Sequence, residues 1–141
     1  MFREYWNDPT ATAGAFADGW LRTGDVGHRD AEGFFYVDDR LNDMVISGGE
    51  NIYPAELENV LGGCPAILEA AVVGRSDERW GEVPIAYVVA KSGSGLTVAG
   101  VMALFEGRLA RFKHPHEIVF LDSLPRNVMG KVLKYELRAR A

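Results

Sequence analysis

The chain has 141 residues, about the size of one domain, and 48% of them are hydrophobic, which is enough to fill a core. No apolar run approaches the roughly 18 residues of a membrane span, and no leader-like stretch is visible at the N-terminus, so the sequence predicts a cytoplasmic chain. The single cysteine, Cys64, excludes an internal disulfide and a cysteine-based metal site, and the net charge of −5 disfavours general nucleic-acid binding.

The charge is unevenly distributed along the chain. Residues 1–100 carry 7 basic and 16 acidic side chains, whereas residues 101–141 carry 8 basic and 4 acidic ones. A basic C-terminal part is typical of a solvated surface, and it is also typical of a surface that meets phosphates. The charge pattern alone leaves both interpretations open.

The N-terminal third predicts the end of a larger domain. Residues 2–17 indicate a short helical or irregular segment, and the extended runs 20–28 and 34–39 flank the turn-forming "RDAEG", which predicts a β-hairpin. About 40 residues are too few to bury a core alone. We therefore expect residues 1–39 to be the incomplete C-terminal end of a large domain, and residues 40–141 to form a complete small domain.

The small domain opens with a short strand, "MVI", which ends in two adjacent glycines, Gly48 and Gly49. The segment 51–64 then predicts a helix, with Pro54 at the first helical position, where its missing N–H is not needed. A plain strand-to-helix connection needs one flexible residue at most. The glycine pair therefore indicates that something comes close to the backbone there.

The remaining elements alternate strands and helices. Residues 67–75 and 84–90 are nearly continuous apolar runs, which is typical of strands covered on both faces. We expect a helix over 98–112, a strand over 116–122 and a final helix over 131–141. This order predicts an α+β fold: a small domain with a mixed three-stranded sheet flanked by helices, preceded by the β-hairpin.

Two residues in turn-forming contexts have chemistry suited to a nucleotide. Asp25, in "WLRTGD", follows a Thr-Gly turn, and its carboxylate can accept hydrogen bonds from two neighbouring hydroxyls such as a ribose diol. Lys131 follows Gly130, and a flexible tip lets a lysine reach outward as a point charge. Taken alone, Asp25 is more typical of an ordinary turn and Lys131 of a solvated helix end. His28 and His116 lack a second ligand at a suitable spacing, so no metal site is predicted.

Taken in order, "WLRTGD", "DDRLNDMVISGGENIYPAELE" and "LPRNVMGKVLKYELR" resemble the C-terminal part of the adenylate-forming (AMP-binding) enzymes. The segments "DRLNDMVISGGENIYPAELE" and "RSDERWGEVPIAYVV" look most like those of fatty-acyl-CoA or aryl-CoA synthetases. The resemblance implies an ATP-dependent acid–thiol ligase of fatty acid or aromatic acid metabolism. Such an enzyme converts a carboxylic acid and ATP to an acyl-adenylate and then transfers the acyl group to coenzyme A, while its small domain swings between two orientations.

The resemblance also implies roles for particular residues. Lys131 matches the catalytic lysine of adenylate formation, Asp25 the aspartate that holds the ribose hydroxyls, and Arg40 an arginine at the domain junction that touches the nucleotide. Gly48 and Gly49 match a loop that lines the tunnel for the pantetheine arm of coenzyme A.

Further matches are looser. Trp80 and Phe112 match aromatic positions near the coenzyme A nucleotide, and Lys113 matches a cationic contact to its phosphates. His114 stands where relatives have a more usual basic residue, and Asn42 stands at the hinge in place of the usual aspartate or lysine.

The expected partners are therefore the acid, ATP, coenzyme A and the missing N-terminal domain. The phosphate loop, the magnesium ligands and the acyl pocket would lie in that domain, so we expect the chain alone to have little or no synthetase activity. Two alternatives stay open: an adenylation domain that loads a carrier protein, and a non-catalytic module that binds coenzyme A.

Overall fold

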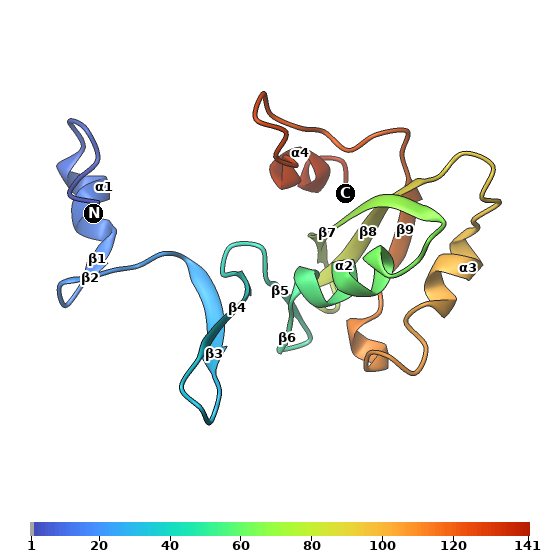
Figure 1. Cartoon of the computed structure of the whole chain (residues 1–141), viewed down its shortest axis with the longest axis horizontal. Helices are drawn as coiled ribbons and strands as arrows, with labels where there is room; N and C mark the ends of the chain where they lie inside the picture. The colour runs from blue at the N-terminus through green and yellow to red at the C-terminus, as the bar shows by residue number, and fades with distance from the viewer. Residues whose placement is uncertain (1) are drawn as a thin grey trace. The chain divides into compact units, whose positions relative to one another are not determined.

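The computed structural model describes residues 2–141, and its internal contacts divide the chain into two compact units, the first ending at Asn42 and the second beginning at Asp43. Figure 1 follows both units along the chain by colour. The division falls within the polar and charged segment "DRLNDM", residues 39–44.

The first unit contains one short helix and two β-ribbons: α1 (Pro9–Gly14), β1 (Phe16–Ala17), β2 (Trp20–Leu21), β3 (Asp25–Arg29) and β4 (Phe35–Arg40). The predicted hairpin forms between β3 and β4, where the Asp30 carboxylate closes the turn by accepting a bond from the Phe34 N–H. The first strand of the hairpin was predicted to begin at residue 20, which is wrong, because Trp20 and Leu21 form β2 and pair with β1 instead. None of the described residues of this unit is buried.

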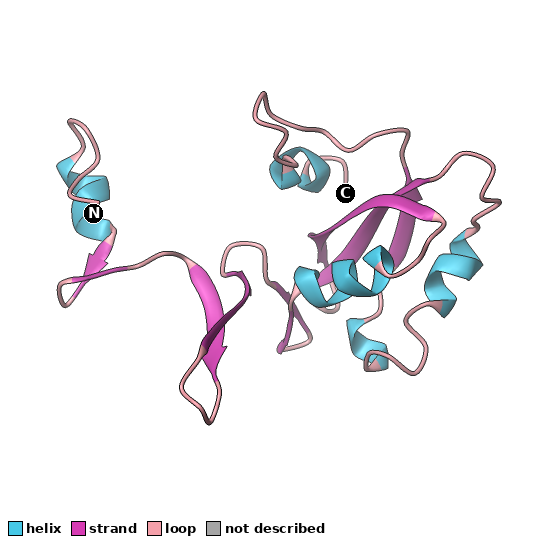
Figure 2. Ribbon diagram, viewed as in Figure 1, coloured by secondary structure: helices cyan, strands magenta, loops and turns pink. Residues whose placement is uncertain are grey.

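The second unit is built on a five-stranded sheet: β5 (Val45–Ser47), β6 (Glu50–Ile52), β7 (Ile67–Asp77), β8 (Gly81–Ala90) and β9 (Glu117–Phe120). The long β8 pairs antiparallel with β7 and parallel with β9, so the predicted mixed arrangement of these three strands is confirmed, but the β5–β6 hairpin brings the sheet to five strands rather than three. The β5–β6 hairpin joins it at the beginning of β8, where Ser47 pairs with Gly81 (Figure 2).

Helices cover both faces of this sheet. The elements α2 (Pro54–Gly62) and α3 (Val98–Ala103) lie on one side and α4 (Lys134–Arg138) on the other, as Figure 1 shows. Each face has its own apolar cluster. The first cluster includes Leu57, Leu61, Val72, Val88, Val101 and Phe105, and the second includes Val73, Ile85, Tyr87, Leu124 and Leu137. The continuous apolar character of β8 therefore reflects burial on two sides.

Three predicted helices are shorter in the structure. The helix expected over 51–64 begins at Pro54, because Ile52 is fully buried opposite Val45 as part of β6. The helix expected over 98–112 ends at Ala103 and gives way to turns that bury Phe105 and to a short 3-10 helix, η1 (Arg111–Lys113).

The final helix begins three residues later than predicted. Lys131 and Val132 instead follow directly after a tight turn, and Val132 forms a β-bridge with Arg126. Polar contacts fasten α4 to the domain. The Tyr87 hydroxyl donates to the Leu137 carbonyl over 3.0 Å, and Arg138 pairs with Asp43 at 2.5 Å.

Candidate functional site

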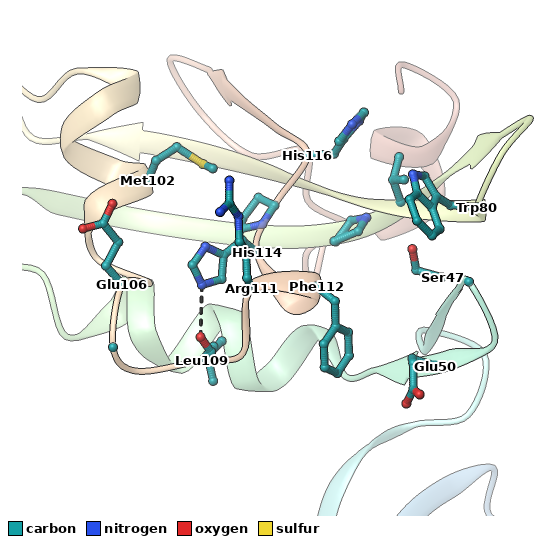
Figure 3. A pocket seen from close by; sticks show the side chains of 15 residues that line it. Ser47, Glu50, Trp80, Met102, Glu106, Leu109, Arg111, Phe112, His114 and His116 are labelled. Atoms are coloured by element: carbon teal, nitrogen blue, oxygen red, sulfur yellow. Dashed lines mark hydrogen bonds between the residues drawn. The ribbon is translucent and has the colours of Figure 1, made fainter.

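A pocket of about 780 Å³ opens on the α3 side of the second unit. Its walls come from the β5–β6 turn, the start of β8, the end of α3 and the segment through η1, and Figure 3 shows Arg111 and His114 between Met102 and Phe112. The lining residues include Ser47, Gly48, Trp80, Pro84, Met102, Leu109, Arg111, Phe112, His114 and His116. The lining combines aromatic surface with cationic and imidazole groups, and with the carboxylates of Glu50 and Glu106.

The glycine pair forms a two-residue β-hairpin turn between β5 and β6, with φ of +59° at Gly48 and +88° at Gly49. Positive φ at both central residues is typical of the turn that matches the twist of paired strands. A Cβ on Gly48 would lie 2.9 Å from the Trp80 ring, whereas a Cβ on Gly49 would meet open space. The close approach of the Trp80 ring therefore requires glycine at position 48, and the positive φ angles favour glycine at both positions.

Asp77 holds Trp80 in place from the other side. The Asp77 carboxylate accepts hydrogen bonds from the backbone N–H groups of Trp80 and Arg79, each at 2.9 Å, and these bonds lower the pKa of Asp77. The Arg79 guanidinium lies 4.7 Å from the centre of the Trp80 ring. Gly48 completes the arrangement by donating its N–H to the Trp80 carbonyl over 2.8 Å.

The three side chains of η1, those of Arg111, Phe112 and Lys113, do not all face the pocket. Arg111 and Phe112 line the pocket. Lys113 does not, because its ammonium pairs with Glu56 of α2 at 2.6 Å. His114 lines the pocket as well, but its Nε2–H donates to the Leu109 carbonyl over 3.1 Å, which fixes the ring. Arg111 is therefore the cation of η1 that faces the pocket.

Lys131 lies on the turn between Leu124 and α4, and its neighbour Val132 packs against the second apolar cluster, on the α4 face of the sheet. Its side chain is exposed, and within residues 2–141 its ammonium forms no ion pair. Its backbone N–H donates to Oδ1 of Asn127 over 2.9 Å, and its carbonyl accepts from the Asn127 N–H. The ammonium thus extends from a backbone that is well fixed.

In the first unit, the hairpin brings Asp25 and Arg40 together as a cross-strand pair. The Arg40 Nε lies 2.9 Å from Oδ1 of Asp25, and the Asp25 N–H donates to the Thr23 hydroxyl over 3.2 Å. Both side chains are partly exposed, at 60% for Arg40 and 30% for Asp25. The hairpin register therefore places two predicted nucleotide contacts side by side, although 15 positions separate them in the sequence.

Residues 2–141 contain neither a metal-binding cluster of side chains nor a membrane-spanning helix. No group of three or more histidine, cysteine or carboxylate side chains in this range is placed to hold a metal ion. No helix in this range has both the length and the apolar character that a bilayer span requires.

The chain belongs to the family of AMP-binding enzyme C-terminal domains, whose model matches residues 56–131. It is similar to the indoleacetate–CoA ligase of Aromatoleum aromaticum, with 59% identity over 98% of this chain, and to the fatty acid–[acyl-carrier-protein] ligase ScoC of Streptomyces coeruleorubidus, with 47% identity over 97%. These matches cover only 27% and 26% of the relatives, so the chain spans about a quarter of their length.

A solved structure shows the same fold. The o-succinylbenzoate CoA synthetase of Bacillus subtilis, in complex with an acyl-adenylate intermediate, matches with a TM-score of 0.89 and 46% identity, covering 96% of this chain and 28% of that one. The predicted resemblance to the C-terminal part of adenylate-forming enzymes is thereby confirmed.

Sequence reasoning missed two features of the site. Arg111 was not singled out, although its position directly before Phe112 in a basic segment could have indicated it. The anchoring of Lys131 by Asn127 was also missed, because the signal consists of one asparagine in a loop. An asparagine side chain often accepts a hydrogen bond from the backbone N–H two residues on, as Asn127 does from Met129, so asparagine in a loop is a weak signal of such a turn.

Proposed function

We propose that this chain is the C-terminal part of an AMP-forming acid–CoA ligase that activates a fatty or aromatic carboxylic acid. In the first step the acid and ATP give an acyl-adenylate and pyrophosphate, and in the second the acyl group passes to coenzyme A. Family membership supports this proposal, as does similarity to relatives that are named CoA ligases. We also propose a cytoplasmic location, where ATP and coenzyme A are available.

The observation that carries the proposal is the exposed Lys131 ammonium on an ordered turn. We assign Lys131 as the catalytic residue of adenylate formation. Negative charge gathers at the α-phosphorus when the carboxylate attacks, and a fixed ammonium in a water-excluded site stabilises that charge. Loss of one such contact typically lowers the rate by about 10²–10³-fold.

We assign Asp25 and Arg40 to the nucleotide. Oδ1 of the Asp25 carboxylate pairs with Arg40, and the second oxygen, Oδ2, can accept hydrogen bonds from ribose hydroxyls. Arg40 supplies a delocalised charge beside the same position. Their cross-strand pairing supports a joint role for the two residues.

We assign the pocket to coenzyme A, with the Gly48–Gly49 turn and Trp80 beside the pantetheine arm and Phe112 near the nucleotide. Lys113 was the expected phosphate contact, but its ion pair with Glu56 would have to break first. Arg111 already lines the pocket, so we assign the phosphate contact to Arg111. Leu124 and Val132, which flank the Lys131 turn, pack in or against the second apolar cluster, whereas the pocket is lined by Met102 and the segment through η1. This separation supports separate presentation of the two regions for the two half-reactions.

One relative favours a second candidate function, the loading of an acyl carrier protein, because ScoC is named as a ligase for that acceptor. Both candidates share adenylate formation and differ in the thiol. A comparison of free coenzyme A with a carrier protein as acceptor separates them.

The test uses a two-domain enzyme in which residues 1–141 follow a large AMP-binding domain, from its own reading frame or from the indoleacetate–CoA ligase. We expect ATP–pyrophosphate exchange with this enzyme and none with the 141-residue chain alone. Lys131→Ala should lower exchange by about 10²–10³-fold, while thioester formation from supplied acyl-adenylate continues. Normal exchange by the isolated chain, or equal loss of both half-reactions in Lys131→Ala, would contradict the proposal.

A further inference from the structure

The turn that carries Lys131 is held by polar contacts that the proposed chemistry does not itself use. We propose that Asn127, together with the Arg126–Glu69 pair, acts as a set of positioning residues that fix the Lys131 turn for adenylate formation. This inference rests on the proposed function of Lys131.

Asn127 contacts the turn at four points. Its side-chain Oδ1 accepts from the N–H groups of Met129 at 3.0 Å and Lys131 at 2.9 Å. Its backbone N–H donates to the Lys131 carbonyl over 2.9 Å, and its carbonyl accepts from the Gly130 N–H over 2.9 Å. Both backbone groups of Lys131 are thus bonded to a single residue.

Arg126 connects the turn to the sheet. Its guanidinium donates to the Gly130 carbonyl through one nitrogen and to Oε1 of Glu69 on β7, at 2.8 Å, through another. The planar guanidinium presents several donors in fixed directions, which lets one side chain hold both partners. The backbone bridge between Arg126 and Val132 closes the base of the turn.

Apolar packing contributes little to the shape of this turn. The side chains of Val128 and Met129 at its tip are almost completely exposed. The hydrogen bonds of Asn127 and Arg126 are therefore what restricts the backbone beside Gly130. Electrostatic catalysis depends on a charge that is already in place when the transition state forms, so the positioning of Lys131 should affect the rate of the chemical step.

The inference is tested in the two-domain enzyme with Asn127→Ala and Glu69→Gln. We expect Asn127→Ala to lower kcat for adenylate formation by about 10–100-fold with little change in KM for ATP, since the lost interaction acts mainly in the transition state. Glu69→Gln should have a smaller effect in the same direction. Asn127→Ser keeps an oxygen acceptor without adding charge and should recover part of the rate.

Two controls separate positioning from folding. Thioester formation from supplied acyl-adenylate should stay within about twofold of the parent enzyme in every variant, because it uses the other side of the domain. Glu117→Gln removes a comparable surface arginine–carboxylate pair, Arg75 with Glu117 at 2.5 Å, and should change neither half-reaction.

The outcomes are distinguishable. The positioning role is overturned if Lys131→Ala abolishes exchange but Asn127→Ala leaves it normal, or if Asn127→Ala lowers both half-reactions equally. If Lys131→Ala itself leaves exchange intact, the proposed function fails and this inference fails with it. Selective loss in Asn127→Ala with partial recovery in Asn127→Ser supports the proposal.

Discussion

At the scale of single residues, Gly48 is a position in the candidate site where the structure leaves little room for a side chain. A Cβ there would approach the Trp80 ring at 2.9 Å and 3.2 Å, and its φ of +59° already disfavours any residue with a side chain. Trp80 cannot move away easily, because its backbone N–H is bonded to Asp77 and its carbonyl to Gly48.

We expect Gly48→Ala to slow thioester formation by about tenfold or more in the two-domain enzyme, while adenylate formation is retained. Gly49→Ala is the matched control, because it carries similar backbone strain but meets no neighbouring atom. Measurement of kcat for both half-reactions in the two variants isolates the steric effect. If Gly48→Ala is no more harmful than Gly49→Ala, contact with Trp80 does not matter for the reaction.

The residue types of the candidate site could be predicted from the sequence better than their contacts. Asp25, Arg40 and Lys131 stand in short motifs that resemble those of the family, and their roles stay predictions that rest on this resemblance. The pairing of Lys113 with Glu56 joins positions 57 apart and depends on how η1 packs against α2. Nothing in the local sequence distinguishes the paired Lys113 from the pocket-lining Arg111, so sequence reasoning selected Lys113.

At the scale of elements, long apolar runs were predictable and short segments were not. Strands β7 and β8 follow from continuous burial on two faces, and Pro54 marks the beginning of α2. Strand β6 was missed because its Ile52 is equally suitable for a helix, and only the pairing of Ile52 with Val45 makes it extended. Helix α3 was predicted too long because apolar periodicity continues past Ala103, whereas Gly100 and Gly107 weaken the helix.

Helix α4 has only one buried residue, Leu137, so we expect its attachment to depend on polar contacts as well. Burial raises the pKa of Tyr87, whose neutral hydroxyl donates to the Leu137 carbonyl. Tyr87→Phe removes this bond but leaves that carbonyl with the Arg140 N–H as a partner. We therefore expect the free energy of unfolding to fall by about 0.5–1.5 kcal/mol, measured by urea denaturation of the chain at pH 7.

The pH dependence gives an independent check on Tyr87. A raised pKa means that the folded state favours the neutral phenol, so the stabilisation is complete below the ordinary tyrosine pKa of 10.0 and is lost as the pH rises through the folded-state pKa. The parent chain should therefore lose more stability above pH 10 than Tyr87→Phe does. An unchanged unfolding free energy in Tyr87→Phe, with identical alkaline profiles, would show that this bond does not hold α4.

At the scale of the whole molecule, the apolar core belongs to the second unit alone. Every member of both buried clusters lies between Val45 and Leu137, and the described part of the first unit, residues 2–42, has no buried residue. That first unit instead exposes large side chains such as Trp6, Trp20 and Phe35. Exposed aromatic surface of this kind is typical of a face that another part of a protein covers. This fits the interpretation of the first unit as the end of a larger domain.

The location of the core predicts that residues 43–141 fold without residues 1–42. The truncated chain should begin at Asp43 rather than later, because Asp43 pairs with Arg138 of α4 at 2.5 Å. We expect its urea midpoint to agree with that of the full chain within error, since no buried side chain is removed.

A chain that begins at residue 46 is the control. It also loses the fully buried Val45, which should cost about 1.5–3 kcal/mol because that is the typical contribution of burying such a side chain. If 43–141 is destabilised as much as 46–141, the first 42 residues support the core in a way that burial does not reveal, and the second unit is not an independent domain.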